Sequence, residues 1–328
     1  MDEFYAGKKV LITGGVGFIG SNLAHRLVDL GAEVMVVDSM LQEYGARLDN
    51  LAGIVDRVRI NFSDVRDAHS LAYLVQGQEL IFSLAGQVSH SDSMRDPMTD
   101  LEINCRSQLS LLECCRRENP GAKIVFASTR QVYGRPRHLP VDEEHPVEPV
   151  DVNGINKLAA EMYYALYDKV HGIRSVSLRL TNTYGPRMDL VSNSKGFVSV
   201  FVRKALKGET IQIYGSGEQQ RDFNYVGDVV EALLLAGACD AVYGGVFNLG
   251  HPHPLTLLGF VELLHEWANF EHEFVPFPPD AKPIDIGDYY GDFAKFERAT
   301  GWRPKVDIQA GLRETFEYYR QHGIPPES

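Results

Sequence analysis

Three glycines and one aspartate near the N-terminus have the spacing of a nucleotide-binding turn. Gly14, Gly17 and Gly20 follow the apolar run 10–13 and precede a helical pattern, so a tight turn joins a strand to a helix. Such a turn lets a pyrophosphate approach the backbone, and the unpaired N–H groups that begin the helix attract its negative charge. Asp38 ends the next apolar run, where an acidic residue typically binds the ribose 2′-hydroxyl. The pattern predicts a dinucleotide site and favours NAD over NADP.

The strands and helices that must position this site can be predicted from the alternation of apolar and helical patterns along the chain. Up to about residue 180, helical patterns alternate with apolar runs at 10–13, 34–37, 58–62, 80–84, 123–127 and 175–180. Such alternation is typical of βαβ units and predicts an α/β fold, a parallel sheet with helices on both faces. We expect a cofactor domain over 1–185, to which one later strand and helix at about 220–250 return, and a smaller, mainly substrate-binding lobe over 186–328.

Composition excludes several classes of partner. A net charge of −12 argues against nucleic acid and against anionic membranes. No apolar run is long enough to span a bilayer, and the first residues lack the pattern of a signal peptide. Because Cys105, Cys114, Cys115 and Cys239 form no Cys-x-x-Cys pair, we expect small buried thiols and no metal site. These features predict a soluble, cytoplasmic protein.

Ordered motifs along almost the whole chain resemble those of the extended short-chain dehydrogenase/reductase family, in its NAD-dependent nucleotide-sugar epimerase/dehydratase branch. They are TGGVGFIGSNL at 13–23, Leu84-Ala85-Gly86, Ala127-Ser128-Thr129, Val132-Tyr133-Gly134, 157–161, 179–187, 213–223 and 225–228. The resemblance implies a Rossmann-type doubly wound parallel sheet, bound NAD, a nucleotide-sugar substrate and a homodimer formed through the helices that flank the active site.

The resemblance also implies a role for individual residues. Thr129 would orient the reacting sugar hydroxyl, and Lys157 would contact the nicotinamide ribose. Substrate contacts would come from Ser93, Asn182 and Arg221, the last two on the diphosphate side. A guanidinium suits phosphate oxygens because it donates two parallel N–H groups; the alternative for Arg221 is a surface salt bridge with Asp222 or Asp228. The expected cofactor contacts are Gly14, Gly17, Phe18, Ile19, Gly20, Asp38, Ser39, Asp64, Val65, Leu84, Ala85, Gly86, Asn104 and Lys157.

Asn153 departs from the family at its most reactive position. The family has a tyrosine four residues before the lysine, and its phenolate removes the hydroxyl proton as hydride leaves the sugar. An amide has no accessible change of protonation, so Asn153 can only orient a hydroxyl or a water by hydrogen bonds. General base catalysis is typically worth about 10²–10⁴ in rate.

Three interpretations of Asn153 are open. Another residue supplies the base, with His90, Tyr133 and Asp151 as candidates. Alternatively, the protein binds NAD and its ligand but does little chemistry, as a sensor or an assembly partner. The third interpretation is an engineered substitution of tyrosine that traps a complex.

Two further departures concern the substrate. In the family's 4,6-dehydratases acidic residues follow the threonine, whereas Arg130 and Gln131 stand here, so a dehydratase is disfavoured, as is a decarboxylase that uses a glutamate at position 131. Arg130 indicates a charged substrate or a structural ion pair. Asp285 occupies a position where relatives commonly place an arginine that grips the second phosphate, so either Lys282 compensates or the nucleotide is held differently.

The favoured hypothesis is an NAD-dependent epimerase, or a related oxidoreductase, that acts on a nucleotide sugar through a transient ketone. Thr129, Asn153 and Lys157 would form its catalytic centre, and Asn153 would work with a partner or a water in place of the phenolate.

Overall fold

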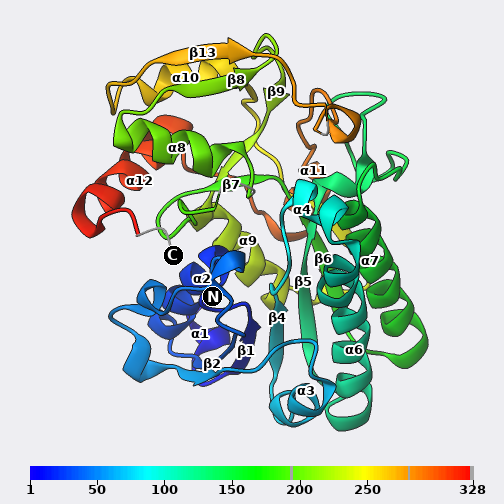
Figure 1. The fold of residues 1–328 in the computed structure, drawn as a ribbon. Coiled ribbons are helices and arrows are strands. Elements are labelled where there is room, and N and C mark those ends of the chain that lie inside the picture. Colours follow the sequence, from blue (N-terminus) through cyan, green and yellow to red (C-terminus); the bar gives the residue numbers. More distant parts are fainter. Residues whose placement is uncertain (193–194, 280, 326–328) are drawn as a thin grey trace.

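A seven-stranded parallel sheet forms the centre of the molecule (Figure 1). The computed structural model describes residues 1–192, 195–279 and 281–325. The strand order is β11-β6-β5-β4-β1-β2-β3, so the chain reverses its direction of travel across the sheet between β3 and β4. This order confirms the predicted α/β fold, a Rossmann-type doubly wound sheet. The strands are β1 (Lys9–Thr13), β2 (Glu33–Val37), β3 (Arg59–Asn61), β4 (Leu80–Ser83), β5 (Lys123–Thr129), β6 (Ser175–Leu180) and β11 (Val246–Asn248).

Helices cover both faces because both faces of each strand are apolar. Along β1, Val10 and Ile12 enter one buried cluster, whereas Leu11 between them enters another on the opposite face. The first cluster lies under α2 (Phe18–Asp29) and α9 (Val226–Ala238), and the second under α3 (Ala68–Leu74), α6 (Ser107–Glu118) and α7 (Val152–His171).

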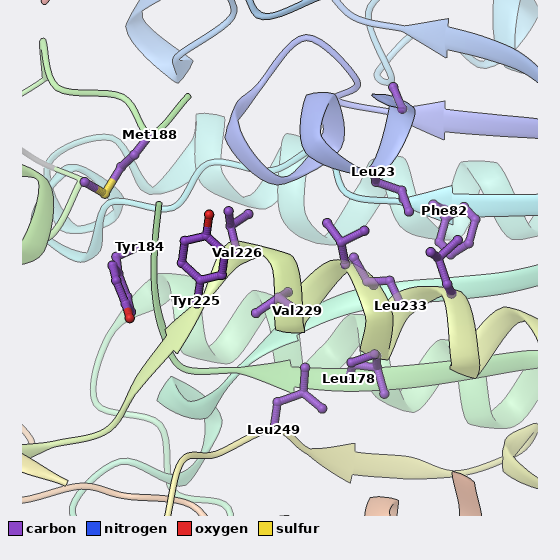
Figure 2. Close-up of a cluster of buried hydrophobic side chains, with 14 of the residues drawn as sticks. Leu23, Phe82, Leu178, Tyr184, Met188, Tyr225, Val226, Val229, Leu233 and Leu249 are labelled. Carbon is purple, nitrogen blue, oxygen red and sulfur yellow. The ribbon is translucent and has the colours of Figure 1, made fainter. Parts of the chain in front are cut away.

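Figure 2 shows that side chains of α9 lie at the centre of the first cluster. Val229 and Leu233 of α9 pack between Leu23 of α2 and the sheet residues Phe82 and Leu178, and all five side chains are almost completely buried. Burying an aliphatic side chain of this size is worth about 1.5–3 kcal/mol. The helix therefore joins the sheet to α2, which begins at the glycine turn.

The C-terminal part forms a lobe above the carboxyl ends of the strands (Figure 1). Its short strands pair as β8 with β13, β7 with β10, and β9 with β12. They are β7 (Asn182–Tyr184), β8 (Ile211–Tyr214), β9 (Gln220–Arg221), β10 (Phe223–Tyr225), β12 (Leu255–Thr256) and β13 (His272–Val275). The helices of this lobe are α8 (Phe197–Lys207), α10 (Leu257–Leu264) and α12 (Ile308–His322), whereas α11 (Ala294–Thr300) packs against β11 of the sheet.

The remaining α-helices are short: α1 (Asp2–Tyr5), α4 (His90–Arg95) and α5 (Pro97–Leu101). Within the described ranges, no helix has both the length and the apolar character needed to cross a bilayer. Since every strand of the sheet is parallel, the segments that follow β1, β2, β4, β5 and β6 all emerge at one edge, beneath the C-terminal lobe.

Candidate active site

A cavity of about 1020 Å³ runs between this sheet edge and the C-terminal lobe. The volume exceeds that of a site for one small ligand, so a dinucleotide and a second molecule can share it. Most of the residues singled out from the sequence line it: Gly14, Gly17, Phe18, Ile19, Gly20, Asp38, Ser39, Asp64, Val65, Leu84, Ala85, Gly86, His90, Thr129, Asn153, Lys157, Asn182 and Arg221. Ser93, Asn104, Tyr133 and Asp151 lie outside the lining.

The glycine turn fits a dinucleotide pyrophosphate because the backbone is too close-packed for side chains. A Cβ added to Gly20 would lie 2.2 Å from the carbonyl oxygen of Gly14, and Gly14 itself has a φ of +72°. Gly17 precedes α2 and offers no side chain to cap it, so the first N–H groups of the helix stay available to an anion. The glycine turn and the start of α2 therefore fit the pyrophosphate that the spacing of the three glycines predicts.

Asp38 follows β2 and is fixed beside the glycine turn. Its carboxylate accepts hydrogen bonds from the N–H of Val16 at 3.2 Å and of Met40 at 3.0 Å. Burial raises the pKa of the Asp38 carboxyl above its usual range, although both N–H groups oppose this shift. Held in this way, Asp38 presents an acceptor to the cavity for a ribose hydroxyl.

Lys157 is buried in α7 with its amine beneath the cavity. Nζ donates to the carbonyl oxygen of Ala127 at 3.1 Å and lies 4.9 Å from the centre of the Phe126 ring. Burial lowers the pKa of Lys157 to about 8, while the negative charges of Asp100 and Glu161 act in the opposite direction. The amine is therefore poised to change its charge near neutral pH.

Asn153 lies in the first turn of α7, and its amide group has one possible orientation. Nδ2 donates to the carbonyl oxygen of Gln87 at 2.8 Å and to Asp100 Oδ2 at 3.2 Å. Both partners are acceptor oxygens, so the NH₂ end of the amide must face them. The amide oxygen is left for a ligand, and Asn153 offers a hydroxyl an acceptor without being able to take its proton.

Three asparagine amides converge on one buried carboxylate, Asp100. Its Oδ1 accepts from Asn156 at 2.8 Å, and its Oδ2 accepts from Asn104 at 3.0 Å as well as from Asn153. Asp100, Asn156 and Gln87 lie outside the sequence motifs. The sequence did contain a signal for this cluster. Asn153 and Asn156 are three residues apart, and Asp100 and Asn104 are four apart. These spacings place the two members of each pair on the same face of a helix.

His90 and Asp151 form a pair at the cavity wall. His90 lines the cavity, and its Nδ1 lies 2.9 Å from Asp151 Oδ2, within ion-pair distance but outside hydrogen-bond geometry; the Asp151 side chain is completely buried. Asp151 also caps α7 by accepting from the N–H of Gly154 at 2.6 Å, and it accepts from Gln131 Nε2 at 2.8 Å. Burial alone would raise the pKa of Asp151, but the contacts with His90, Gly154 and Gln131 hold it below its usual range. A small rotation of the ring would let Nδ1–H donate to this carboxylate, which favours the tautomer whose free lone pair is on Nε2.

Arg221 lines the opposite end of the cavity. Its Nη1 donates to the carbonyl oxygens of Gln220 and Gly287, and its Nη2 lies 3.6 Å from Asp285 Oδ1. Burial, reinforced by the charge of Arg130, lowers the pKa of Arg221 to about 10. The side chain is 6% exposed, so it is not the surface residue of the alternative prediction. Its carboxylate partner is the Asp285 that replaces the family's arginine.

The sequence matches the NAD dependent epimerase/dehydratase family over residues 10–250. The chain belongs to this family. A putative UDP-glucose 4-epimerase of Methanocaldococcus jannaschii is 30% identical over 95% of this chain and 99% of that protein. UDP-glucuronic acid decarboxylase 1 of Xenopus tropicalis is 32% identical over 96% of this chain and 72% of that protein. The crystal structure of a UDP-glucose 4-epimerase from Thermotoga maritima with UDP-glucose has a TM-score of 0.87 at 32% identity, and the match covers 95% of this chain and 99% of that one.

Membership confirms the family and the cofactor that the sequence predicted: the protein is an NAD-dependent enzyme of the nucleotide-sugar epimerase/dehydratase family. Epimerases and a decarboxylase both occur among its relatives, so membership leaves the reaction open. In the part of the chain that the structure describes, no group of His, Cys, Asp and Glu side chains is arranged to hold a metal ion.

Three residues that the family resemblance or the search for a base indicated do not line the cavity. Ser93 is buried; it donates to the carbonyl oxygen of His90 at 2.7 Å and accepts from the N–H of Asn153 at 3.2 Å, so it joins α4 to α7. Asn104 belongs to the Asp100 cluster. Tyr133 donates to Asn248 Oδ1 at 2.7 Å, and burial raises its pKa to about 12. Tyr133 is therefore a neutral phenol outside the cavity lining, and it does not serve as the missing base.

Proposed function

We propose that the protein is a nucleotide-sugar epimerase in which His90, oriented by Asp151, replaces the tyrosine base of the family. The observation that carries this proposal is the His90–Asp151 pair, with 2.9 Å between Nδ1 and Oδ2 and with His90 at the cavity wall. A histidine held by a buried carboxylate is the common arrangement of a general base, because the carboxylate fixes the tautomer and stabilises the imidazolium that forms.

The chain's own residues would then divide the work. Thr129 and the amide oxygen of Asn153 orient the reacting sugar hydroxyl, and Nε2 of His90 takes its proton. Bound NAD would supply the hydride acceptor as NAD⁺ and, once reduced to NADH, the hydride donor for the opposite face of the ketone. His90 returns its proton to the ketone oxygen, so the reaction is balanced with no other reactant. Lys157, as a cation, favours the developing negative charge on that oxygen.

Elimination and decarboxylation are less well supported. Gln131 occupies the position after Arg130, and its Nε2 is engaged with Asp151 at 2.8 Å. An amide in this position cannot donate and recover a proton at neutral pH. Epimerisation needs neither an acid nor a base at position 131, and the M. jannaschii and T. maritima relatives are both named as UDP-glucose 4-epimerases.

The test is turnover of nucleotide sugars by the NAD-loaded protein, with products identified by NMR and mass spectrometry and NADH followed at 340 nm. We expect an epimer of one sugar, and we expect His90→Gln to lower kcat by about 10²–10⁴. Asp151→Asn should also lower kcat while keeping helix α7 capped, because asparagine caps helices as well as aspartate does. His138→Gln is the matched control, since His138 forms an exposed pair with Asp142 at 3.8 Å.

Full activity of His90→Gln would refute the proposed base. No conversion of any sugar, with NAD bound, would favour the alternative of a binding protein. An increase of activity in Asn153→Tyr would identify an ordinary enzyme that carries a damaging substitution.

We also propose that the protein is a homodimer and that it works in the cytoplasm. Four side chains on the outer face of α7 are exposed although they are apolar: Ile155, Met162, Leu166 and Val170. Their spacing of seven, four and four residues places them in one stripe of the helix. All four cysteines are free thiols, which suits a reducing compartment.

A further inference from the structure

Arg130 is a cationic side chain of the cavity that the proposed reaction does not use. It begins the short helix η5 (Arg130–Tyr133), directly after Thr129 at the end of β5. The side chain lines the cavity, and its Cζ lies 5.2 Å from the centre of the Tyr289 ring. The charge is therefore fixed one residue away from the hydroxyl that is expected to orient the reacting sugar.

The hydrogen bonds of Arg130 are incomplete. Nη2 donates to the neutral Asn182 Oδ1 at a long 3.4 Å, and Nη1 is buried without a hydrogen-bond partner. Among residues 1–192, 195–279 and 281–325, no carboxylate forms a salt bridge with Arg130, so the structural ion pair that the sequence left open is not formed there. A buried guanidinium N–H without an acceptor is unfavourable. An anionic oxygen of a ligand would supply this acceptor.

Burial lowers the pKa of Arg130, and three neighbouring acids, Asp222, Asp151 and Asp285, oppose this shift without forming a salt bridge with it. Asp285 lies 3.6 Å from Arg221. Asp222 is completely buried and accepts from the N–H of Gly291 at 3.0 Å, whereas its Oδ1 has no partner. Burial raises the pKa of Asp222 to about 6, so near neutral pH it is mostly ionised. These acids help to keep Arg130 charged, and they leave its Nη1 without an acceptor.

Arg130 lies between the residues expected to contact the sugar and those expected to contact the diphosphate. The guanidinium of Arg221 already lies on the side that is expected to hold the phosphates. It contacts two carbonyl oxygens and Asp285 there. Arg130 follows Thr129, which is expected to orient the reacting hydroxyl, and its Nη2 contacts Asn182, which is expected on the diphosphate side. With Arg221 on the phosphates, Arg130 is left for an anion on the sugar. A carboxylate matches a guanidinium in shape, because its two oxygens accept two parallel N–H groups.

We propose that Arg130 binds a carboxylate carried by the sugar ring, so that the substrate belongs to the nucleotide-linked uronic acids. The proposal rests on the proposed nucleotide-sugar function and narrows it to acidic sugars. Neutral sugars would leave the buried guanidinium without its acceptor and would bind more weakly.

Calorimetry of the NAD-loaded protein with UDP, UDP-glucose and UDP-glucuronate tests this inference, because the two sugars differ only in the carboxylate. We expect the wild type to bind UDP-glucuronate at least about tenfold more tightly than UDP-glucose. Arg130→Gln should abolish this preference and leave the Kd values of UDP and UDP-glucose within about threefold. Arg130→Lys, which keeps the charge but loses the second N–H, should retain part of the preference. The control is Arg137→Gln, because Arg137 is exposed and pairs with Glu148.

Three outcomes would overturn the inference. Equal Kd values for both sugars in the wild type would show that no carboxylate is recognised. An equal loss of all three ligands in Arg130→Gln, with thermal unfolding unchanged, would place Arg130 on the diphosphate. Binding of none of the ligands by the wild type would refute recognition of UDP-sugars altogether, whereas the first two outcomes leave that recognition intact.

Discussion

At the scale of single residues, Asn153 works as part of a cluster rather than as a truncated tyrosine. Its NH₂ group is shared between Gln87 and Asp100, and Asp100 gathers two further amides. A buried carboxylate needs such donors, because an unpaired buried charge is strongly unfavourable. The asparagine is therefore integrated into the wall of the site, which argues for a centre rebuilt around it.

Replacing Asn153 by tyrosine tests this view. We expect Asn153→Tyr to lower the free energy of unfolding by about 1–3 kcal/mol, because Asp100 and Gln87 each lose a donor. Turnover should fall or stay unchanged, since His90 already supplies the base. Urea denaturation and steady-state rates measure the two effects. A variant that is as stable as the wild type and much more active would contradict the interpretation.

The spacing of residues in the sequence predicts some positions in the site and not others. The glycines, Asp38, Thr129 and Lys157 lie in the cavity because backbone geometry fixes where a turn, a strand end and a helix start must be. Tyr133 belongs to an equally recognisable motif, yet its hydroxyl bonds Asn248, which is 115 residues away in the sequence. The direction of a side chain at a strand end depends on such distant partners, and a single sequence does not contain them.

At the scale of elements, α5 and α7 together set the charge of Lys157. Asp100 of α5 raises the pKa of Lys157, which burial lowers to about 8. A lysine is a cation below its pKa, so activity that needs this cation should decline as the pH rises through about 8. Asp100→Asn removes the opposing charge and should move that decline to lower pH.

Profiles of kcat/KM against pH for the wild type and Asp100→Asn measure this shift. Asp240→Asn serves as the control because Asp240 is exposed and pairs with Lys123 at 2.7 Å, away from the cavity. Identical alkaline limbs for the wild type and Asp100→Asn would show that Lys157 does not control the decline.

The glycine turn is the element whose geometry the sequence predicted most fully, and it allows a matched pair of variants. Gly20→Ala would place a Cβ 2.2 Å from a backbone oxygen, so the turn must open. We expect this variant to be destabilised by about 1–3 kcal/mol and to lose most of its NAD. Gly121→Ala meets nothing within 4 Å and should change stability by less than about 0.5 kcal/mol. Thermal unfolding and the NAD content of the purified proteins distinguish the two, and equal NAD contents would contradict a tight approach of the pyrophosphate.

At the scale of the whole molecule, the alternation of apolar runs was sufficient to predict the parallel sheet, because strands buried on both faces must be apolar throughout. The C-terminal lobe was harder to predict. Its strands, such as β9 (Gln220–Arg221) and β12 (Leu255–Thr256), are two to four residues long and pair with segments far away in the sequence. Short pairings of this kind carry no periodic signal.

Helix α7 connects the site to the outer surface, and this connection makes assembly relevant to activity. Its inner face carries Asn153 and Lys157, whereas its outer face carries the exposed stripe that includes Met162 and Leu166. Because an apolar stripe on the surface favours burial against a partner, we expect the 36.6 kDa chain to sediment as a dimer. Leu166→Arg would place a charge in that interface and should weaken the dimer at least about 100-fold.

Analytical ultracentrifugation measures the assembly, and Tyr73→Arg on α3 is the control because Tyr73 is 76% exposed and lies away from the stripe. A monomeric wild type, or a Leu166→Arg variant that still dimerises, would refute the interface. If dimerisation holds α7 in place, the monomeric variant should also lose activity at low protein concentration. Its NAD affinity should stay close to that of the wild type, since the glycine turn joins β1 to α2 and is not part of α7. A monomer with full activity would show that each chain builds its site alone.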